Sequence, residues 1–114
     1  MPSKPKQYKV IWSDIAEQDL EAIVMYIAKD SPNNALKVFA NIKKQCENLD
    51  IFPNRGHIVP ELKKFNILQY LQIIIEHWRV IYKIVDKQVF VLSVIDSFRN
   101  VEDILLERFT YSNK

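Results

Sequence analysis

Glycine is nearly absent from this chain of 114 residues. Gly56 is the only one, whereas an average composition would give roughly eight. Phosphate-binding P-loops, dinucleotide-binding turns, nucleophile elbows of the Gly-x-Ser-x-Gly type and EF-hand loops all require glycine at fixed positions. The sequence therefore excludes these classes of site. We expect Gly56 itself to occupy a turn where the backbone needs a positive φ.

Cysteine, histidine and long apolar runs are scarce as well. Cys46 is the only cysteine, which rules out an intramolecular disulfide and a cysteine-based zinc site. The histidines, His57 and His77, are far apart in the sequence and lack a carboxylate at metal-ligand spacing, so we expect no metal and no cofactor. No apolar run reaches the roughly 18 residues that span a bilayer, and residues 1–9 do not read as a signal sequence. These features favour a cytoplasmic protein without membrane contact.

The chain does contain enough apolar material for one core. Hydrophobic residues make up 48% and charged residues 26%, which predicts a single domain over residues 1–114. The net charge of +2 is too small to indicate a nucleic-acid partner. Residues 1–13 hold three lysines and no acid, and residues 14–30 hold five acids and one lysine. This distribution fits either faces of opposite charge or an ordinary mixed surface.

The apolar spacing changes from a helical to an extended pattern along the chain. It predicts a strand at 8–12, a helix capped by Ser13 or Asp14, a second helix opened by Ser31-Pro32, strands at 67–75, 78–85 and 88–95, and a short helix after Val101. The two helices are close enough in sequence to form an antiparallel hairpin. We therefore predict an α+β fold of two layers, in the order βααβββ with a short C-terminal helix and a largely antiparallel sheet.

The same spacing predicts which residues are buried. The second helix has an apolar stripe formed by Ala35, Val38, Phe39, Ile42, Cys46 and Leu49. On the strand at 78–85, the face that begins with Trp78 is wholly apolar or aromatic and should pack on the hairpin. Arg79 then lies on the opposite face, where it either forms a local salt bridge or presents a fixed donor to phosphate or carboxylate. The acids at the start of the first helix, including Asp19, are explained by the helix dipole.

Several segments spread along the chain resemble one known family. The most specific are the Phe-Pro-x-Arg-Gly segment at 52–56 and Val-Pro-Glu-Leu at 59–62, correctly spaced from Trp-Arg-Val-Ile-Tyr at 78–82. Further matches are Tyr8-Lys9-Val10, Ser13, Ala16, Asp19-Leu20, Val91-Leu92, Asp96, Arg99 and Leu105-Leu106-Glu107-Arg108. Together they resemble the ParE/RelE superfamily of type II toxin–antitoxin toxins, on its ParE side, over nearly the whole chain.

The resemblance implies a small growth inhibitor that a cognate antitoxin neutralises. ParE-like members poison DNA gyrase, whereas RelE-like members cut messenger RNA on the ribosome. Arg79 and Arg99 match the arginines of the RelE pattern, but Tyr70 and Gln72 stand where the ribonucleases carry lysines and Leu105 replaces their tyrosine. Tyr111 is a weak substitute because it lies in a polar tail. The ParE pattern is also incomplete, since Gly56-His57, Leu71-Gln72 and Phe98-Arg99 replace its usual Gly-Arg, Arg-Glu and Arg-Arg pairs.

These comparisons of motifs favour a toxin that acts by binding, with DNA gyrase as its target. The candidate target-binding residues are Arg79, Arg99 and Arg108, and no residue is assigned a catalytic role. Two alternatives stay open: a ribosome-dependent mRNA endonuclease that uses Arg79 and Arg99, and a non-toxic module that only binds its antitoxin. In each case we expect a hetero-oligomer in which an amphipathic antitoxin segment lies along the hairpin and the sheet.

Overall fold

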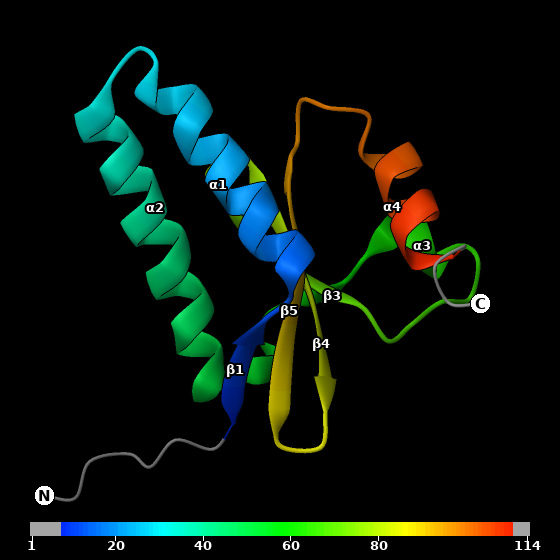
Figure 1. Cartoon of the computed structure of the whole chain (residues 1–114). Coiled ribbons are helices and arrows are strands. Elements are labelled where there is room, and N and C mark those ends of the chain that lie inside the picture. Colours follow the sequence, from blue (N-terminus) through cyan, green and yellow to red (C-terminus); the bar gives the residue numbers. More distant parts are fainter. Residues whose placement is uncertain (1–7, 111–114) are drawn as a thin grey trace, which may run out of the picture.

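The computed structural model describes residues 8–110, which form the expected α+β fold (Figure 1). Its elements are β1 (Lys9–Trp12), α1 (Asp14–Ala28), α2 (Pro32–Glu47), β2 (His57–Ile58), α3 (Pro60–Lys63), β3 (Leu71–Ile75), β4 (Trp78–Val85), β5 (Gln88–Asp96) and α4 (Val101–Phe109). Two short 3-10 turns, Asn48–Asp50 and Pro53–Arg55, lead from α2 to β2. The predicted N-terminal strand, helical hairpin and C-terminal helix are confirmed.

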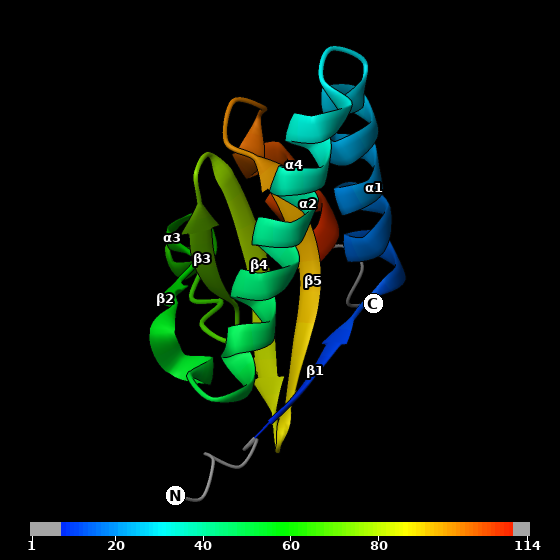
Figure 2. The ribbon, with the colours of Figure 1, turned by 90° about the vertical axis from the view of Figure 1, so that its left-hand side faces the viewer.

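The sheet has the strand order β1-β5-β4-β3-β2. All neighbouring pairs are antiparallel except β1 and β5, which run parallel. Figures 1 and 2 show the α1–α2 hairpin on one face of this sheet, with α3 and α4 at the opposite face. The sheet therefore has a different set of helices on each side.

Local sequence signals start the helices where we predicted them. The Ser13 hydroxyl accepts a hydrogen bond from the Ala16 N–H at 3.1 Å and caps α1. Ser31 caps α2 in the same way, and Pro32 occupies its first position, where no backbone donor is needed. Asn100 caps α4 through a bond from the Asp103 N–H at 3.3 Å. Contacts within one helical turn therefore mark these boundaries.

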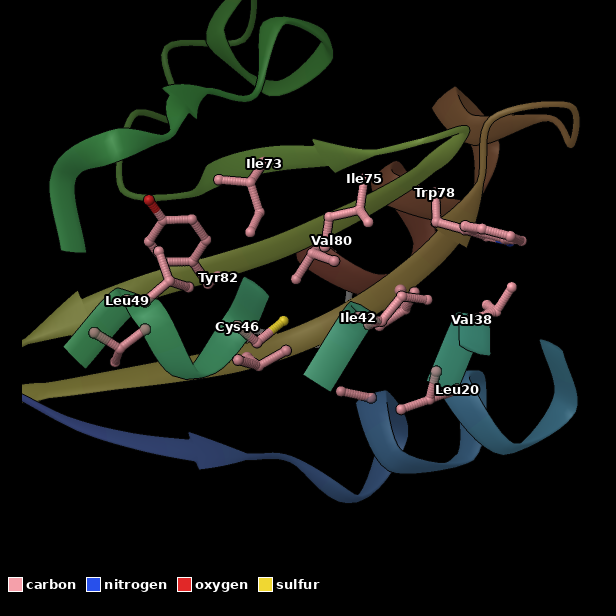
Figure 3. Packing of buried hydrophobic residues seen from close by; sticks show 14 residues of the cluster. Leu20, Val38, Ile42, Cys46, Leu49, Ile73, Ile75, Trp78, Val80 and Tyr82 are labelled. Carbon is pink, nitrogen blue, oxygen red and sulfur yellow. The ribbon is translucent and has the colours of Figure 1, made fainter. Parts of the chain in front are cut away.

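The main core lies between the hairpin and the sheet (Figure 3). Trp78, Val80 and Tyr82 point into it from alternate positions of β4, as predicted. The predicted stripe of α2 is buried except for Phe39, a residue that is 41% exposed. Cys46 is fully buried, and this burial raises the pKa of its thiol to about 12. A second, smaller core joins α3 and α4 to the other face of the sheet.

Three features of the sheet differ from the sequence prediction or were absent from it. β3 begins at Leu71 and not at residue 67, because the chain first reverses after α3 through Asn66, which has a φ of 63°. β2 and α3 are too short to leave a periodic pattern. In β5, Leu92 is an extra residue, since Ile81 pairs with Ser93 and Tyr82 with Val91.

Gly56 does not have the positive φ that we expected. Its φ is −82° and its ψ is 177°, an extended conformation that any residue can adopt. The reason for glycine is steric, because a Cβ atom here would lie 2.5 Å from both the Gln72 carbonyl oxygen and the Tyr82 hydroxyl oxygen. The Tyr82 hydroxyl accepts a hydrogen bond from the Gly56 N–H at 3.0 Å and donates one to the Pro53 carbonyl at 2.7 Å. The glycine permits this close packing of the turn on β4.

Candidate functional site

Arg79 is held by an acidic partner on the α3 side of the sheet. Its Nη1 and Nη2 atoms donate to the two carboxylate oxygens of Glu61 at 2.8 and 2.7 Å, and its Nε donates to the Gln72 Oε1 at 2.9 Å. The Arg79 side chain is only 11% exposed. These hydrogen bonds from Arg79 lower the pKa of Glu61 against the opposing effect of burial. Of the two roles that the sequence left open for Arg79, the structure contains the local salt bridge.

Arg108 is held in a second network that ties α4 to the rest of the fold. Its guanidinium donates to both carboxylate oxygens of Asp19, at 2.7 and 3.1 Å, and to the Ser93 hydroxyl at 2.9 Å. Asp19 also accepts a hydrogen bond from the Val94 N–H at 3.0 Å. The helix dipole therefore does not account for Asp19, contrary to our expectation, because this carboxylate joins α1, β5 and α4.

Arg99 differs from these two arginines. It follows the end of β5, and its backbone N–H donates to the Asp96 carbonyl at 3.0 Å. Within residues 8–110, its exposed guanidinium has neither a salt bridge nor a hydrogen bond. Arg99 lines a cavity of about 550 Å³ between the hairpin and the sheet, which we call the hairpin groove.

The hairpin groove has an apolar floor and a polar rim. Its floor is formed by Ala22, Ile23, Ile27, Val38, Trp78 and Val94. Around the rim lie Tyr26, which is 72% exposed, and the charged or polar residues Glu76, His77, Asp96 and Arg99. The His77 ring stacks on Trp78 with its centroid 4.0 Å away and places its Nδ1 atom 3.2 Å from Asp96 Oδ1. An apolar floor with polar groups at its edges suits an amphipathic peptide segment.

The candidate arginines are not brought together in one site. Trp78 and Arg99 both line the hairpin groove, whereas Arg79, the residue after Trp78, points to the other face and binds Glu61. Arg99 therefore lines the groove on the hairpin side of the sheet, and Arg79 is engaged on the α3 side. The tyrosine Tyr70 is buried and packs on Phe109, with ring centroids 4.7 Å apart. Leu105 is also buried, and Tyr111 lies outside the described residues.

Sequence reasoning missed the carboxylate partners of Arg79 and Arg108. Glu61 belongs to a segment that we had noted for its family resemblance, but nothing in its spacing indicated a salt bridge with Arg79. Asp19 and Arg108 are far apart in the chain, so no local pattern pairs them. The hairpin groove, which draws on both helices and on two strands, had no local signal either.

Two kinds of feature are missing from the part of the chain that the structure covers. Among residues 8–110 there is no group of three or more histidine, cysteine, aspartate or glutamate side chains that could hold a metal ion. None of the helices in this range has the length and apolar character needed to cross a membrane.

Comparison with known proteins adds two findings to this geometry. In structure, the chain is similar to a protein described as "Chromosomal ParDE TA system from P. aeruginosa", with a TM-score of 0.65 and 21% sequence identity. That match covers 81% of this chain and 98% of the other. No curated protein matches the sequence. The family described as "ParE toxin of type II toxin-antitoxin system, parDE" matches residues 10–101, and the chain therefore belongs to this ParE toxin family.

Proposed function

We propose that this ParE-type toxin inhibits growth by binding DNA gyrase and that an antitoxin in the hairpin groove holds it inactive. In this proposal the toxin acts as a binding protein in the cytoplasm and makes no covalent change to its target. The toxin and antitoxin form a hetero-oligomer. The sequence resemblance to gyrase-poisoning ParE members supports the choice of target.

The observation that carries the choice of binding over RNA cleavage is the separation of Arg79 from Arg99. Cleavage of the RelE type needs several charged and acid–base groups around one phosphate. Here Arg79 is paired with Glu61 on one face of the sheet, while Arg99 lies at the groove on the other. This arrangement supports the view that the two arginines do not act on a common phosphate.

The groove supports the second part of the proposal. Its floor offers apolar surface from α1, α2, β4 and β5, and its rim carries polar groups that can orient a helix or an extended segment. Tyr26 and Phe98 expose large apolar surface, with 72% and 82% of each residue accessible. Phe98 stacks on the rim residue His77, with ring centroids 4.9 Å apart. An antitoxin that covered this region would remove these rings from water.

Two assays on the purified full-length chain test the mode of action. We expect the toxin to inhibit supercoiling of relaxed plasmid DNA by gyrase and to leave ribosome-bound mRNA intact. Cleavage of mRNA during translation without any effect on gyrase would overturn the proposal. The double variant Glu61→Gln with Arg79→Gln removes both charges and keeps amide groups that can form hydrogen bonds. Loss of activity by this variant in an intact fold would indicate that the Arg79 charge itself is required.

Expression in bacteria tests the remaining alternative. The third candidate is a non-toxic module that binds its antitoxin. Growth should stop when the chain is expressed alone and recover when the protein encoded beside its gene is expressed with it. Normal growth in the first case, together with a stable complex in the second, would favour the non-toxic module.

A further inference from the structure

The charged side chains at the rim of the hairpin groove are unequally engaged. Asp19, which also lines the groove, is paired with Arg108. Asp96 accepts a hydrogen bond from the Phe98 N–H at 2.9 Å and contacts His77. Within the described residues, Arg99 instead keeps its guanidinium without a partner. The rim thus presents an available cation next to an apolar floor.

We propose that Arg99 selects an acidic partner, so that the hairpin groove takes an amphipathic segment whose aspartate or glutamate pairs with this guanidinium. This inference rests on the proposed function, which assigns the groove to the antitoxin. The apolar side chains of the segment fill the cavity of about 550 Å³, and its carboxylate lies at the edge where Arg99 stands. The planar guanidinium can hold a carboxylate through two parallel hydrogen bonds, which fixes the position of the segment along the groove.

The other charges near the rim determine where this carboxylate can lie. Lys29 places its Nζ atom 5.8 Å from the centre of the Tyr26 ring, but it is not among the residues that line the groove. Glu76, in the turn between β3 and β4, accepts a hydrogen bond from the Asn41 side-chain amide at 3.3 Å. It repels an acidic group at its own position. The partner therefore has its acid opposite Arg99 and a neutral or basic residue opposite Glu76.

The remaining arginines of the candidate set do not offer the same recognition. Arg79 and Arg108 each donate to both oxygens of an internal carboxylate, Glu61 and Asp19. An external carboxylate at either position would compete with a preformed pair and leave an uncompensated acid behind. Within residues 8–110, the Arg99 guanidinium has no hydrogen bond that an acidic partner would have to break. This difference assigns the selection of the partner to Arg99.

Binding of the protein encoded beside the toxin gene to the full-length toxin, measured by titration calorimetry, tests the inference. Because one charge-assisted contact is lost, we expect Arg99→Gln to raise the Kd about tenfold and to reduce its dependence on salt. We expect Glu76→Gln to leave the Kd unchanged or to lower it. The control Lys63→Gln removes the same charge from an exposed residue of α3, on the other side of the sheet, and should leave the Kd within about twofold.

A charge swap identifies the partner's acid. Arg99→Glu should weaken binding more than Arg99→Gln does, and one change of an acidic residue to lysine in the partner should restore it. A Kd within about twofold of wild type for Arg99→Gln, or no rescue from any acidic position, would overturn the inference. The inference would also be overturned if Glu76→Gln weakened binding and Arg99→Gln did not, because this result indicates a basic partner.

A variant on the floor of the groove separates this inference from the proposed function. Ala22 is exposed on α1 and lines the groove, so Ala22→Trp fills the cavity without disturbing the core. Loss of binding by Ala22→Trp, with a normal Kd for Arg99→Gln, would keep the groove as the antitoxin site and reject the role of Arg99. Unchanged binding by Ala22→Trp would reject the groove itself. Circular dichroism of both variants checks that the fold is intact.

Discussion

Replacing the single glycine by alanine gives a test in which two physical effects have opposite signs. Gly56 has an extended backbone with a φ of −82°, which alanine adopts without strain. If nothing else mattered, Gly56→Ala would stabilise the protein by about 0.4–1 kcal/mol, because alanine restricts the unfolded chain. The packing of Gly56 predicts the reverse.

The magnitude follows from the contacts of the missing Cβ atom. It would lie 2.5 Å from the Gln72 carbonyl oxygen and 2.5 Å from the Tyr82 hydroxyl oxygen, well inside van der Waals contact. Relief of such overpacking costs about 1–3 kcal/mol. If the Tyr82 ring moves away, its two hydrogen bonds weaken, and each contributes about 1 kcal/mol. We expect Gly56→Ala to lower the free energy of unfolding by about 2–3 kcal/mol after the backbone gain is subtracted.

Urea unfolding, followed by tryptophan fluorescence and circular dichroism, measures this loss. Asn54, an exposed residue two positions before Gly56, gives a matched control, and Asn54→Ala should change the free energy of unfolding by less than about 0.5 kcal/mol. Tyr82→Phe removes the hydroxyl that the new methyl group meets, so the double variant should lose less than the sum of the single losses. An unchanged or higher stability of Gly56→Ala would refute the steric explanation of this glycine.

Three further predictions concern side chains that the tertiary structure pairs or buries. Asp19→Asn should lower the free energy of unfolding by about 2 kcal/mol, because it leaves Arg108 without its carboxylate, whereas Glu17→Gln in an exposed salt bridge should change it by less than about 0.5 kcal/mol. At pH 8 the buried Cys46 thiol should react with a thiol reagent only as fast as the protein unfolds, and fast reaction of the folded protein would contradict this burial. Burial raises the pKa of this thiol from 9.0 to about 12, so the stability from the buried neutral thiol is lost as the pH rises from 9 towards 12. The pKa of Glu61 is lowered from 4.5 in the folded state, so the stabilisation from this carboxylate is complete above pH 4.5 and is lost as the pH falls through the lowered value. Glu61→Gln should therefore make the decline of stability in acid shallower, which urea unfolding between pH 6 and pH 3 would measure.

Much of the fold could be predicted because its signals are local. Ser13, Ser31 and Pro32 start the two long helices through contacts within one turn. Alternation along β4 identified the face that packs on the hairpin. One error is Phe39, which the helical period places in the buried stripe but which stays 41% exposed, because the period does not say how far the covering elements extend. The short β2 and α3 depend on packing against β3 and α4 more than on their own pattern.

The candidate site was predictable only as a set of residue types. The sequence indicated Arg79, Arg99 and Arg108 as candidates for binding, but it could not distinguish among them. An arginine can bind an external partner most easily when no carboxylate of its own chain is paired with it. The carboxylates paired with Arg79 and Arg108 lie 18 and 89 residues away in the chain, so no local pattern shows which arginine is paired. Only the folded chain places Arg99 at the groove without a carboxylate partner among residues 8–110.

The sequence by itself determined the three longer helices, the longer strands, the toxin family that the chain resembles and the classes of site that a single glycine excludes. These properties depend on the spacing of residues along the chain, which folding does not change. The tertiary structure decided why that glycine is needed and which arginine stays available, because both depend on atoms brought together from distant segments. Gly56 meets Tyr82 across the fold, and Arg99 alone of the three candidate arginines meets no carboxylate within residues 8–110.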